Sequence, residues 1–189
     1  MEHKDGASAV IADKSSEYGS ICGYASTWIR KADAAGDVVK RGAFRKSIEQ
    51  IEREGRVIPF LFNHKHDDVN SFIGRVTHLE EDENGLLFWA DFDNTADAQR
   101  ARGLVKDGRI TGFSFAYNIL DQGKVTLPDG SRANELRELE ILEISLTMYP
   151  VNRDTSVVTI KTMKNVLNER RRKRQLLKQA DRILRESEV

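Results

Sequence analysis

The chain has 189 residues, 39% of them hydrophobic and 32% charged, which fits one domain with an appended segment. Its formal net charge is zero, but residues 165–189 hold eight Lys/Arg against four Asp/Glu, so the rest of the chain is acidic. Folds that bind polyanions carry their basic residues in the main body. The main domain is therefore not expected to bind nucleic acid.

Cysteine usage and hydropathy exclude further classes. Cys22 is the only cysteine, so neither an intrachain disulfide nor a CxxC zinc site can form, which fits a reducing compartment. The N-terminal residues lack the basic and then apolar layout of a signal peptide. No apolar run approaches the ~20 residues that cross a bilayer, and no membrane association is expected.

The pattern along the chain predicts mostly strands. Residues 1–17 are polar and indicate a loose N-terminal arm. Apolar or alternating runs bounded by turn formers predict strands at 20–27, 57–62, 71–80, 85–93, 109–120 and 136–149, and one more after Pro150. Apolar residues at helical spacing predict helices at 43–54 and 95–107, and residues 121–134 are expected to form an exposed loop.

Seven or eight strands and two helices that do not alternate regularly favour a mainly β fold with flanking helices (α+β), built on an antiparallel, barrel-like sheet. We expect this domain to span 18–164. Residues 165–189 predict a basic amphipathic helix that follows it. That helix could pack one face on the barrel or on a neighbour, or bind an acidic partner or nucleic acid.

The segment Asn63–Asp68, NHKHDD, follows the apolar run VIPFLF and places two histidines beside two carboxylates. It is similar to the HxHxDH pattern of metallo-hydrolases, but Val69 stands where the last histidine would be. A catalytic zinc takes three protein ligands, and Asp67 or Asp68 could complete a set. A metal site therefore stays one interpretation.

A catalytic pair is the second interpretation, because an imidazole can take a proton from a hydroxyl at neutral pH. Ser114 is the better partner, since it lies between Gly112 and Ala116 on the small-residue face of its strand. Cys22 fits a buried apolar position instead. A serine in a strand is more often structural, so this position alone decides nothing.

A third group must orient the histidine. Glu143 lies inside the apolar run ILEISL, where a carboxylate is unfavourable unless it is paired. Alternation places Glu143, Ser145 and Ile141 on one face of the strand. Glu143 could orient the imidazole, as the buried acid of a triad does, or it could face solvent.

Several short motifs occur together in one order. They are GYAS at 23–26, GD at 36–37, RGAF at 41–44, NH at 63–64, IGRV at 73–76, GL at 85–86, GFSFAY at 112–117, LEISL at 142–146 and a Pro-x-Asn at 150–152. Over roughly residues 20–161 this order resembles the caudovirus prohead (procapsid maturation) protease family, which is distantly similar to the herpesvirus assemblin serine proteases.

The resemblance implies a serine endopeptidase that needs no cofactor and acts in the host cytoplasm, inside the assembling procapsid. Its substrate would be the scaffolding segment of the major capsid protein or a separate scaffold protein, and often the enzyme itself. Carried over by motif, His64 would be the general base, Ser114 the nucleophile and Glu143 the third member, with His66 a bystander. A homo-oligomer, for example a dimer, is implied by analogy.

Two positions depart from the family pattern. Ala116 stands where a glycine is expected, and Val151 stands where a small residue is common. The backbone of Val151, Asn152 and Arg153 should lie close to the strand of Glu143, and it is our candidate for the oxyanion donors. The rival readings are a non-catalytic β-barrel scaffold or assembly module that binds the capsid interior or DNA through its tail, and a metallo-hydrolase.

Overall fold

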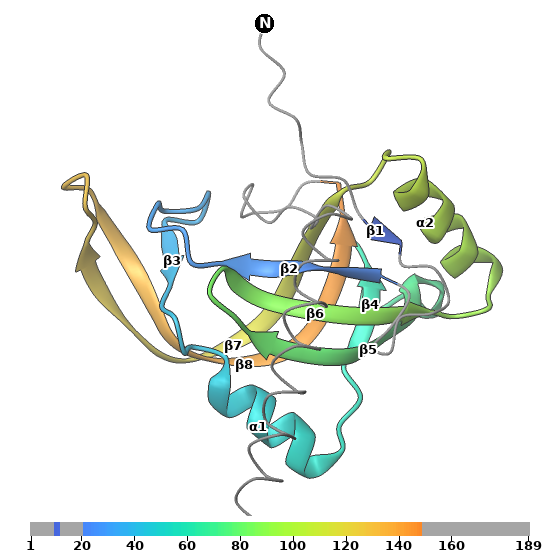
Figure 1. The fold of residues 1–189 in the computed structure, drawn as a ribbon, viewed down its shortest axis with the longest axis horizontal. Helices are drawn as coiled ribbons and strands as arrows, with labels where there is room; N and C mark the ends of the chain where they lie inside the picture. Colours follow the sequence, from blue (N-terminus) through green and yellow to red (C-terminus); the bar gives the residue numbers. More distant parts are fainter. Residues whose placement is uncertain (1–9, 12–20, 149–189) are drawn as a thin grey trace, which may run out of the picture.

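A computed structural model of the chain describes residues 10–11 and 21–148 (Figure 1). In this part eight strands form one sheet in the order β1-β2-β6-β5-β4-β8-β3, and β7 pairs with β8. The strands are β1 (Val10–Ile11), β2 (Ile21–Thr27), β3 (Asp37–Val39), β4 (Pro59–Phe62), β5 (Phe72–Glu81), β6 (Gly85–Phe92), β7 (Gly112–Thr126) and β8 (Arg132–Thr147). The helices are α1 (Arg45–Glu54), α2 (Ala96–Lys106) and a single 3₁₀ turn, η1 (Val69–Ser71).

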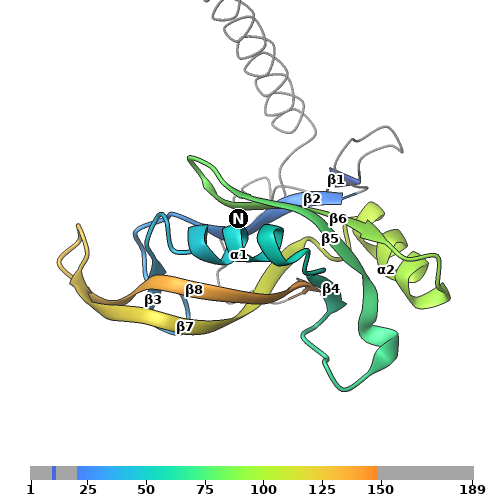
Figure 2. The ribbon, with the colours of Figure 1, turned by 90° about the horizontal axis from the view of Figure 1, so that it is seen from below.

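The sheet curls on itself, with α1 and α2 beside it (Figures 1 and 2). The expected mainly β fold with flanking helices is confirmed. Most of the strand pairs are antiparallel, as expected, but β3 and β4 both pair with β8 in parallel. The N-terminal arm, the strand after Pro150 and the basic helix at 165–189 lie outside the described residues. Within the described ranges, no helix is long and apolar enough to cross a membrane.

Both predicted helices are confirmed, and their ends follow from the sequence. In α1, Ile51 is buried while charged side chains face outward, and Gly55 ends the helix in the left-handed conformation (φ 64°). The helix α2 begins at Thr95, whose hydroxyl accepts a hydrogen bond from the Ala98 N–H at 3.3 Å. Its buried face is made of small residues, which lets the helix lie close to the sheet.

The predicted loop at 121–134 is wrong. The strands β7 and β8 continue through this region as one long hairpin, paired from Gly112↔Thr147 to Thr126↔Arg132, and the hairpin projects beyond the rest of the sheet (Figure 1). Only the LPDGS turn at 127–131 is left, where Gly130 takes a positive φ of 83°. A small separate core of Val38, Leu127 and Ala133 stabilises the tip, and it brings in β3, which the sequence did not reveal.

Aromatic side chains fix the orientation of β7. Phe113 is fully buried and packs edge-on against Phe88 at a centroid distance of 4.8 Å. Gly23 on β2 lies under the same ring, since a Cβ there would come within 2.4 Å of it. Because side chains alternate along a strand, burying Phe113 turns the next residue, Ser114, to the opposite face.

The backbones of β2 and β6 come unusually close beside the turn between β5 and β6. Asp82 organises the turn, and its carboxylate accepts hydrogen bonds from the N–H of Asn84 at 2.7 Å and of Gly85 at 3.0 Å. Burial and the hydrogen bond to Asp82 raise the pKa of Tyr24 above its ordinary value. A Cβ at Gly85 would lie 2.0 Å from the Ser26 carbonyl oxygen, so only glycine fits there.

Replacing Gly85 by alanine should therefore lower the free energy of unfolding by about 1–3 kcal/mol, as overpacking against fixed backbone does. The matched control is Gly103→Ala in α2, where a Cβ would meet nothing within 4 Å and should stabilise the helix by about 0.5–1 kcal/mol. Urea unfolding followed by circular dichroism measures both. Equal effects at the two positions would contradict the close approach of β2 and β6.

Candidate active site

Small and polar side chains gather on one face of the β7–β8 pair. Ser114 is directly opposite Ser145, and Ala116 is opposite Glu143. Opposed residues of an antiparallel pair point to the same side, with Cβ atoms about 4.5–5.5 Å apart. On this face, called the site face below, Gly112, Ser114 and Ala116 of β7 lie opposite Thr147, Ser145 and Glu143 of β8.

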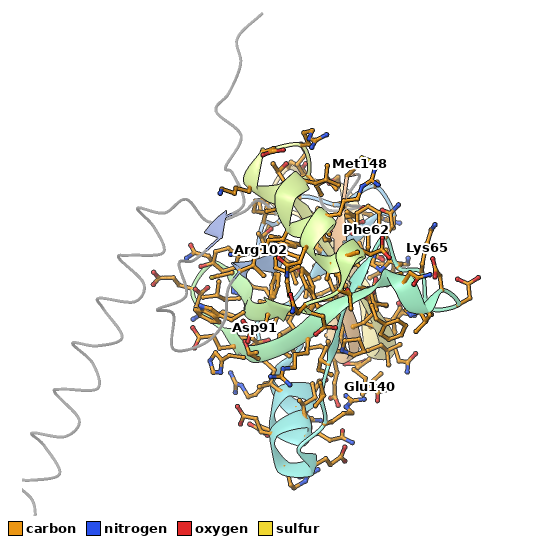
Figure 3. The ribbon with its side chains drawn as sticks, turned by 90° about the vertical axis from the view of Figure 1, so that its right-hand side faces the viewer. Phe62, Lys65, Asp91, Arg102, Glu140 and Met148 are labelled. Atoms are coloured by element: carbon orange, nitrogen blue, oxygen red, sulfur yellow. The ribbon has the colours of Figure 1, made fainter. Side chains whose placement is uncertain are left out.

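The chain leaves β4 through a left-handed turn. Asn63 has φ 62° and His64 has φ 57°, and within the described residues these are the only non-glycine residues with positive φ. A regular strand would place His64 on the same side as Phe60 and Phe62. The two left-handed residues break this alternation, and the His64 ring reaches the site face. In Figure 3, Phe62 and Lys65 mark the two sides of this turn, and Met148 marks the end of the described chain.

Three alternate residues of β8 hold this turn. The Glu143 carboxylate lies 2.5 Å (Oε1) from His64 Nδ1. The Ser145 hydroxyl accepts a hydrogen bond from the His64 backbone N–H at 3.1 Å. The Thr147 hydroxyl donates to Asn63 Oδ1 at 3.1 Å. These contacts stabilise a backbone conformation that costs a residue with a Cβ about 1–2 kcal/mol.

Glu143 is 1% exposed, so its carboxylate must be satisfied inside the protein. Oε1 faces His64, and Oε2 accepts a hydrogen bond from the Ser145 hydroxyl at 2.7 Å. The alternative that Glu143 faces solvent is wrong. A carboxylate accepts hydrogen bonds, so this contact suits the His64 tautomer with its proton on Nδ1. The His64 side chain is 36% exposed.

A β-bulge turns the Glu143 side chain away from the hydrophobic core and toward the site face. The pairing steps from Ala116↔Glu143 to Tyr117↔Ile141, which leaves Leu142 as an extra residue, 37% exposed. The predicted grouping of Ile141 with Glu143 on one face is therefore wrong. Ile141 joins Ile144 and Leu146 in the core, while Glu143 faces the site.

Ser114 is half-buried on the site face, across from Ser145. Its hydroxyl makes no hydrogen bond within the described residues, and neither does His64 Nε2. Catalytic hydrogen bonds are often long in unliganded enzymes and shorten when substrate binds. The tertiary structure thus pairs His64 with Glu143 and places Ser114 on the same face, although the three residues lie on three different strands or strand ends.

The rest of the NHKHDD segment forms a closed loop. Asp68 accepts a hydrogen bond from the Asn70 N–H at 2.9 Å, and the Ser71 hydroxyl binds the carbonyl groups of Lys65 and Asp68. His66 and Asp67 are exposed. In the part of the chain that the structure describes, no group of three or more His, Cys, Asp or Glu could hold a metal ion.

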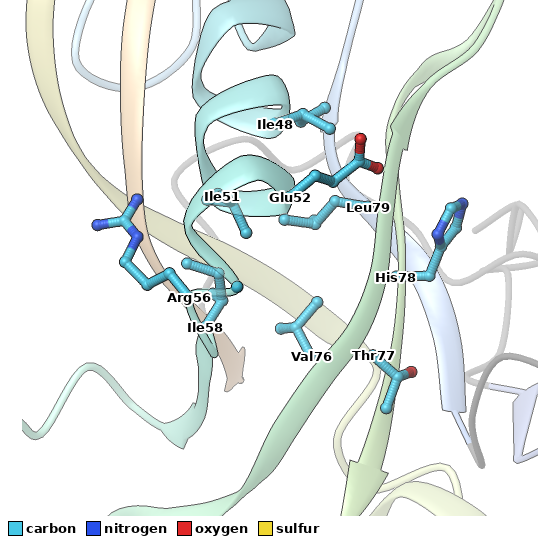
Figure 4. Close-up of a pocket in the computed structure, with 10 residues that line it drawn as sticks. Ile48, Ile51, Glu52, Arg56, Ile58, Val76, Thr77, His78 and Leu79 are labelled. Carbon is cyan, nitrogen blue, oxygen red and sulfur yellow. The ribbon is translucent and has the colours of Figure 1, made fainter.

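A separate cavity of about 290 Å³ lies between α1 and β5 (Figure 4). Its walls are mainly aliphatic, with Glu52, Arg56 and His78 at the edges. None of His64, Ser114 or Glu143 lines it, so it is distinct from the site face.

The sequence pattern of the caudovirus prohead serine protease family matches residues 8–169. The chain belongs to this family. The prohead protease of Escherichia phage T5 is 29% identical over 143 residues, which cover 76% of this chain and 63% of that protein. A KSHV protease in complex with a hexapeptide phosphonate inhibitor aligns with a TM-score of 0.45 at 10% identity, covering 71% of this chain and 61% of the other. The chain thus spans less than two thirds of the length of each of these two proteins.

Sequence reasoning placed His64, Ser114 and Glu143 by motif, but it assigned no role to Ser145. The available signal was the alternation in LEISLT, which puts Ser145 on the same face as Glu143. The predicted oxyanion donors near Val151, Asn152 and Arg153 lie outside the described residues.

The left-handed turn makes its own prediction. Asn63→Ala and Asn63→Gly both remove the hydrogen bond from Thr147. Only alanine places a Cβ on a residue with positive φ, which destabilises the folded state. Asn63→Ala should therefore be less stable than Asn63→Gly by about 1 kcal/mol, measured by urea unfolding. In a regular strand the order would be reversed, so alanine proving the more stable variant would argue against the turn.

Proposed function

We propose that this protein is a serine endopeptidase with Ser114 as nucleophile, His64 as general base and Glu143 as the acid that orients His64. The observation that carries the proposal is the contact between the buried Glu143 carboxylate and His64 Nδ1, 2.5 Å apart, on the same sheet face as Ser114. Membership in the prohead serine protease family supports the same chemistry.

The proposed reaction gives each of the three groups one role. Ser114 Oγ attacks the scissile carbonyl carbon while its proton passes to His64 Nε2. The imidazolium that forms is stabilised by the Glu143 carboxylate at Nδ1, and it then gives its proton to the leaving amine. Water enters, His64 takes a proton from it, and the acyl bond to Ser114 is hydrolysed, which returns the proton to Ser114.

The tetrahedral oxyanion needs preorganised donors, and one good N–H is worth about 3–4 kcal/mol. We propose the backbone near Val151, Asn152 and Arg153 for this role, because β8 leads the chain directly from Glu143 to this segment.

We further propose that the enzyme acts inside the assembling procapsid in the infected host cell. Its substrate would be the scaffolding segment of the major capsid protein, or a scaffold protein, and the enzyme itself. The domain would span 18–164, and the basic segment 165–189 would bring it into the shell or mediate self-association. The name of the T5 relative, a prohead protease, supports this assignment.

The nucleophile can be tested without knowing the substrate. A fluorophosphonate probe should label the wild-type protein at Ser114, as mapped by peptide mass spectrometry. Ser114→Ala and His64→Ala should lose labelling by about 10⁴-fold or more, as in other serine proteases. His66→Ala is the matched control, an exposed histidine two residues away, and should label like wild type. Labelling that persists in Ser114→Ala would refute the assignment.

The role of Glu143 has a sharper test in Glu143→Gln. The side-chain amide keeps the size of the carboxylate, but it can no longer both accept from His64 Nδ1–H and balance an imidazolium. The reaction rate should fall by about 10⁴-fold, with a smaller change in thermal stability than in Glu143→Leu. A rate equal to that of wild type would remove Glu143 from the mechanism.

The biological substrate is tested by co-expression with the cognate capsid protein and intact-mass measurement. Fragments that appear with wild type and not with Ser114→Ala would identify both the substrate and the cleavage site. Shells that assemble with no Ser114-dependent fragment would instead favour a scaffold role.

A further inference from the structure

Ser145 occupies the centre of the candidate site, yet the triad chemistry does not call on it. It is fully buried, and it is the residue directly opposite Ser114 in the β7–β8 register. Its hydroxyl makes two hydrogen bonds. It donates to Glu143 Oε2 at 2.7 Å and accepts from the His64 backbone N–H at 3.1 Å.

We propose that Ser145 is a positioning residue that fixes both the Glu143 carboxylate and the His64 backbone in the geometry that the reaction needs. This inference rests on the proposed serine protease function. Within the described residues, the Ser145 hydroxyl bonds to Glu143 and to the His64 backbone and makes no hydrogen bond with Ser114, so we assign it a positioning role.

A glutamate needs such a partner more than an aspartate does. Its side chain has one more rotatable bond, its terminal torsion is broad, and ordering it costs more conformational entropy. The hydrogen bond to Oε2 selects the rotamer in which Oε1 faces His64 Nδ1. Without that bond, the carboxylate could rotate away from the imidazole while it stays buried.

The second hydrogen bond acts on the backbone. His64 lies at φ 57°, a conformation that its side chain disfavours, and its N–H would have no other acceptor within the described residues. Ser145 Oγ supplies that acceptor. A single hydroxyl therefore ties the peptide group of the general base to the carboxylate that orients the same base.

Ser47 of α1 is a matched control that contacts the same strand, β8. It is also buried, at 5% exposure, and its hydroxyl accepts a hydrogen bond from the Ile141 N–H of β8 at 2.9 Å. Ser47→Ala and Ser145→Ala thus each remove a buried hydroxyl and leave one backbone N–H unsatisfied, that of Ile141 and that of His64 respectively. Only Ser145 also touches Glu143 and His64, so a purely structural role predicts the same phenotype for both variants.

The first readout is the rate of labelling by the fluorophosphonate probe as its concentration is varied. Ser145→Ala should lower the limiting rate by about 10- to 100-fold, the usual effect of losing a group that orients a site ligand, while the half-saturating probe concentration stays the same. Ser47→Ala should label like wild type. Ser145→Cys, which keeps a weaker donor of similar shape, should fall between wild type and Ser145→Ala.

The second readout does not need activity. In ¹⁵N-histidine-labelled protein, the Nδ1–H proton of His64 should give a resonance, assigned by its loss in His64→Ala, that Ser145→Ala broadens or shifts upfield and Ser47→Ala leaves in place. Urea unfolding of each variant shows that the fold is retained under the conditions used.

The outcomes separate the two proposals. If wild type labels at Ser114 and Ser145→Ala labels as fast as Ser47→Ala, the positioning role is wrong and the protease assignment stands. If wild type does not label at all, the protease assignment fails, and the His64 resonance alone decides whether Ser145 fixes the pair. An unchanged resonance in Ser145→Ala overturns the inference in either case.

Discussion

The arrangement of the site depends on one buried carboxylate. Glu143 lies in the strand that pairs with β3, β4 and β7, and it is almost completely removed from water. A charge in that position is tolerated only when its oxygens are paired. His64 and Ser145 supply the partners, so the same contacts that make the buried charge tolerable also hold the imidazole of the candidate base.

Two local irregularities make this pairing geometrically feasible. The bulge at Leu142 lets Ile141 and Ile144 both enter the core while Glu143 faces the site. The left-handed residues Asn63 and His64 move the histidine off the face on which a regular strand would place it. Backbone of this kind is found at functional sites, where the surrounding contacts hold it in place. Here Ser145 and Thr147 provide those contacts.

The expected elements were recovered where the local pattern was strong. The helices at 43–54 and 95–107 and the strands around VIPFLF and GLLFWADF follow from apolar periodicity and from Gly or Thr at their ends. The predicted loop at 121–134 is wrong, because this segment contains two Asp, two Gly and one Pro, which local propensity assigns to a loop. Pairing with the partner strand and the small core at Leu127 outweigh that propensity.

The sequence alone singled out the three side chains that we propose for the chemistry. A histidine after an apolar strand, a serine on a small-residue face and a carboxylate inside an apolar run are all visible in the printed chain, as is their family order. The tertiary structure decided that His64 and Glu143 pair, that Ser145 bonds to both, and that Ser114 lies on the same face. Parallel pairing of β4 with β8 and the contacts of His64 join residues about 80 positions apart. No local periodicity encodes them, nor does it encode the bulge or the left-handed turn.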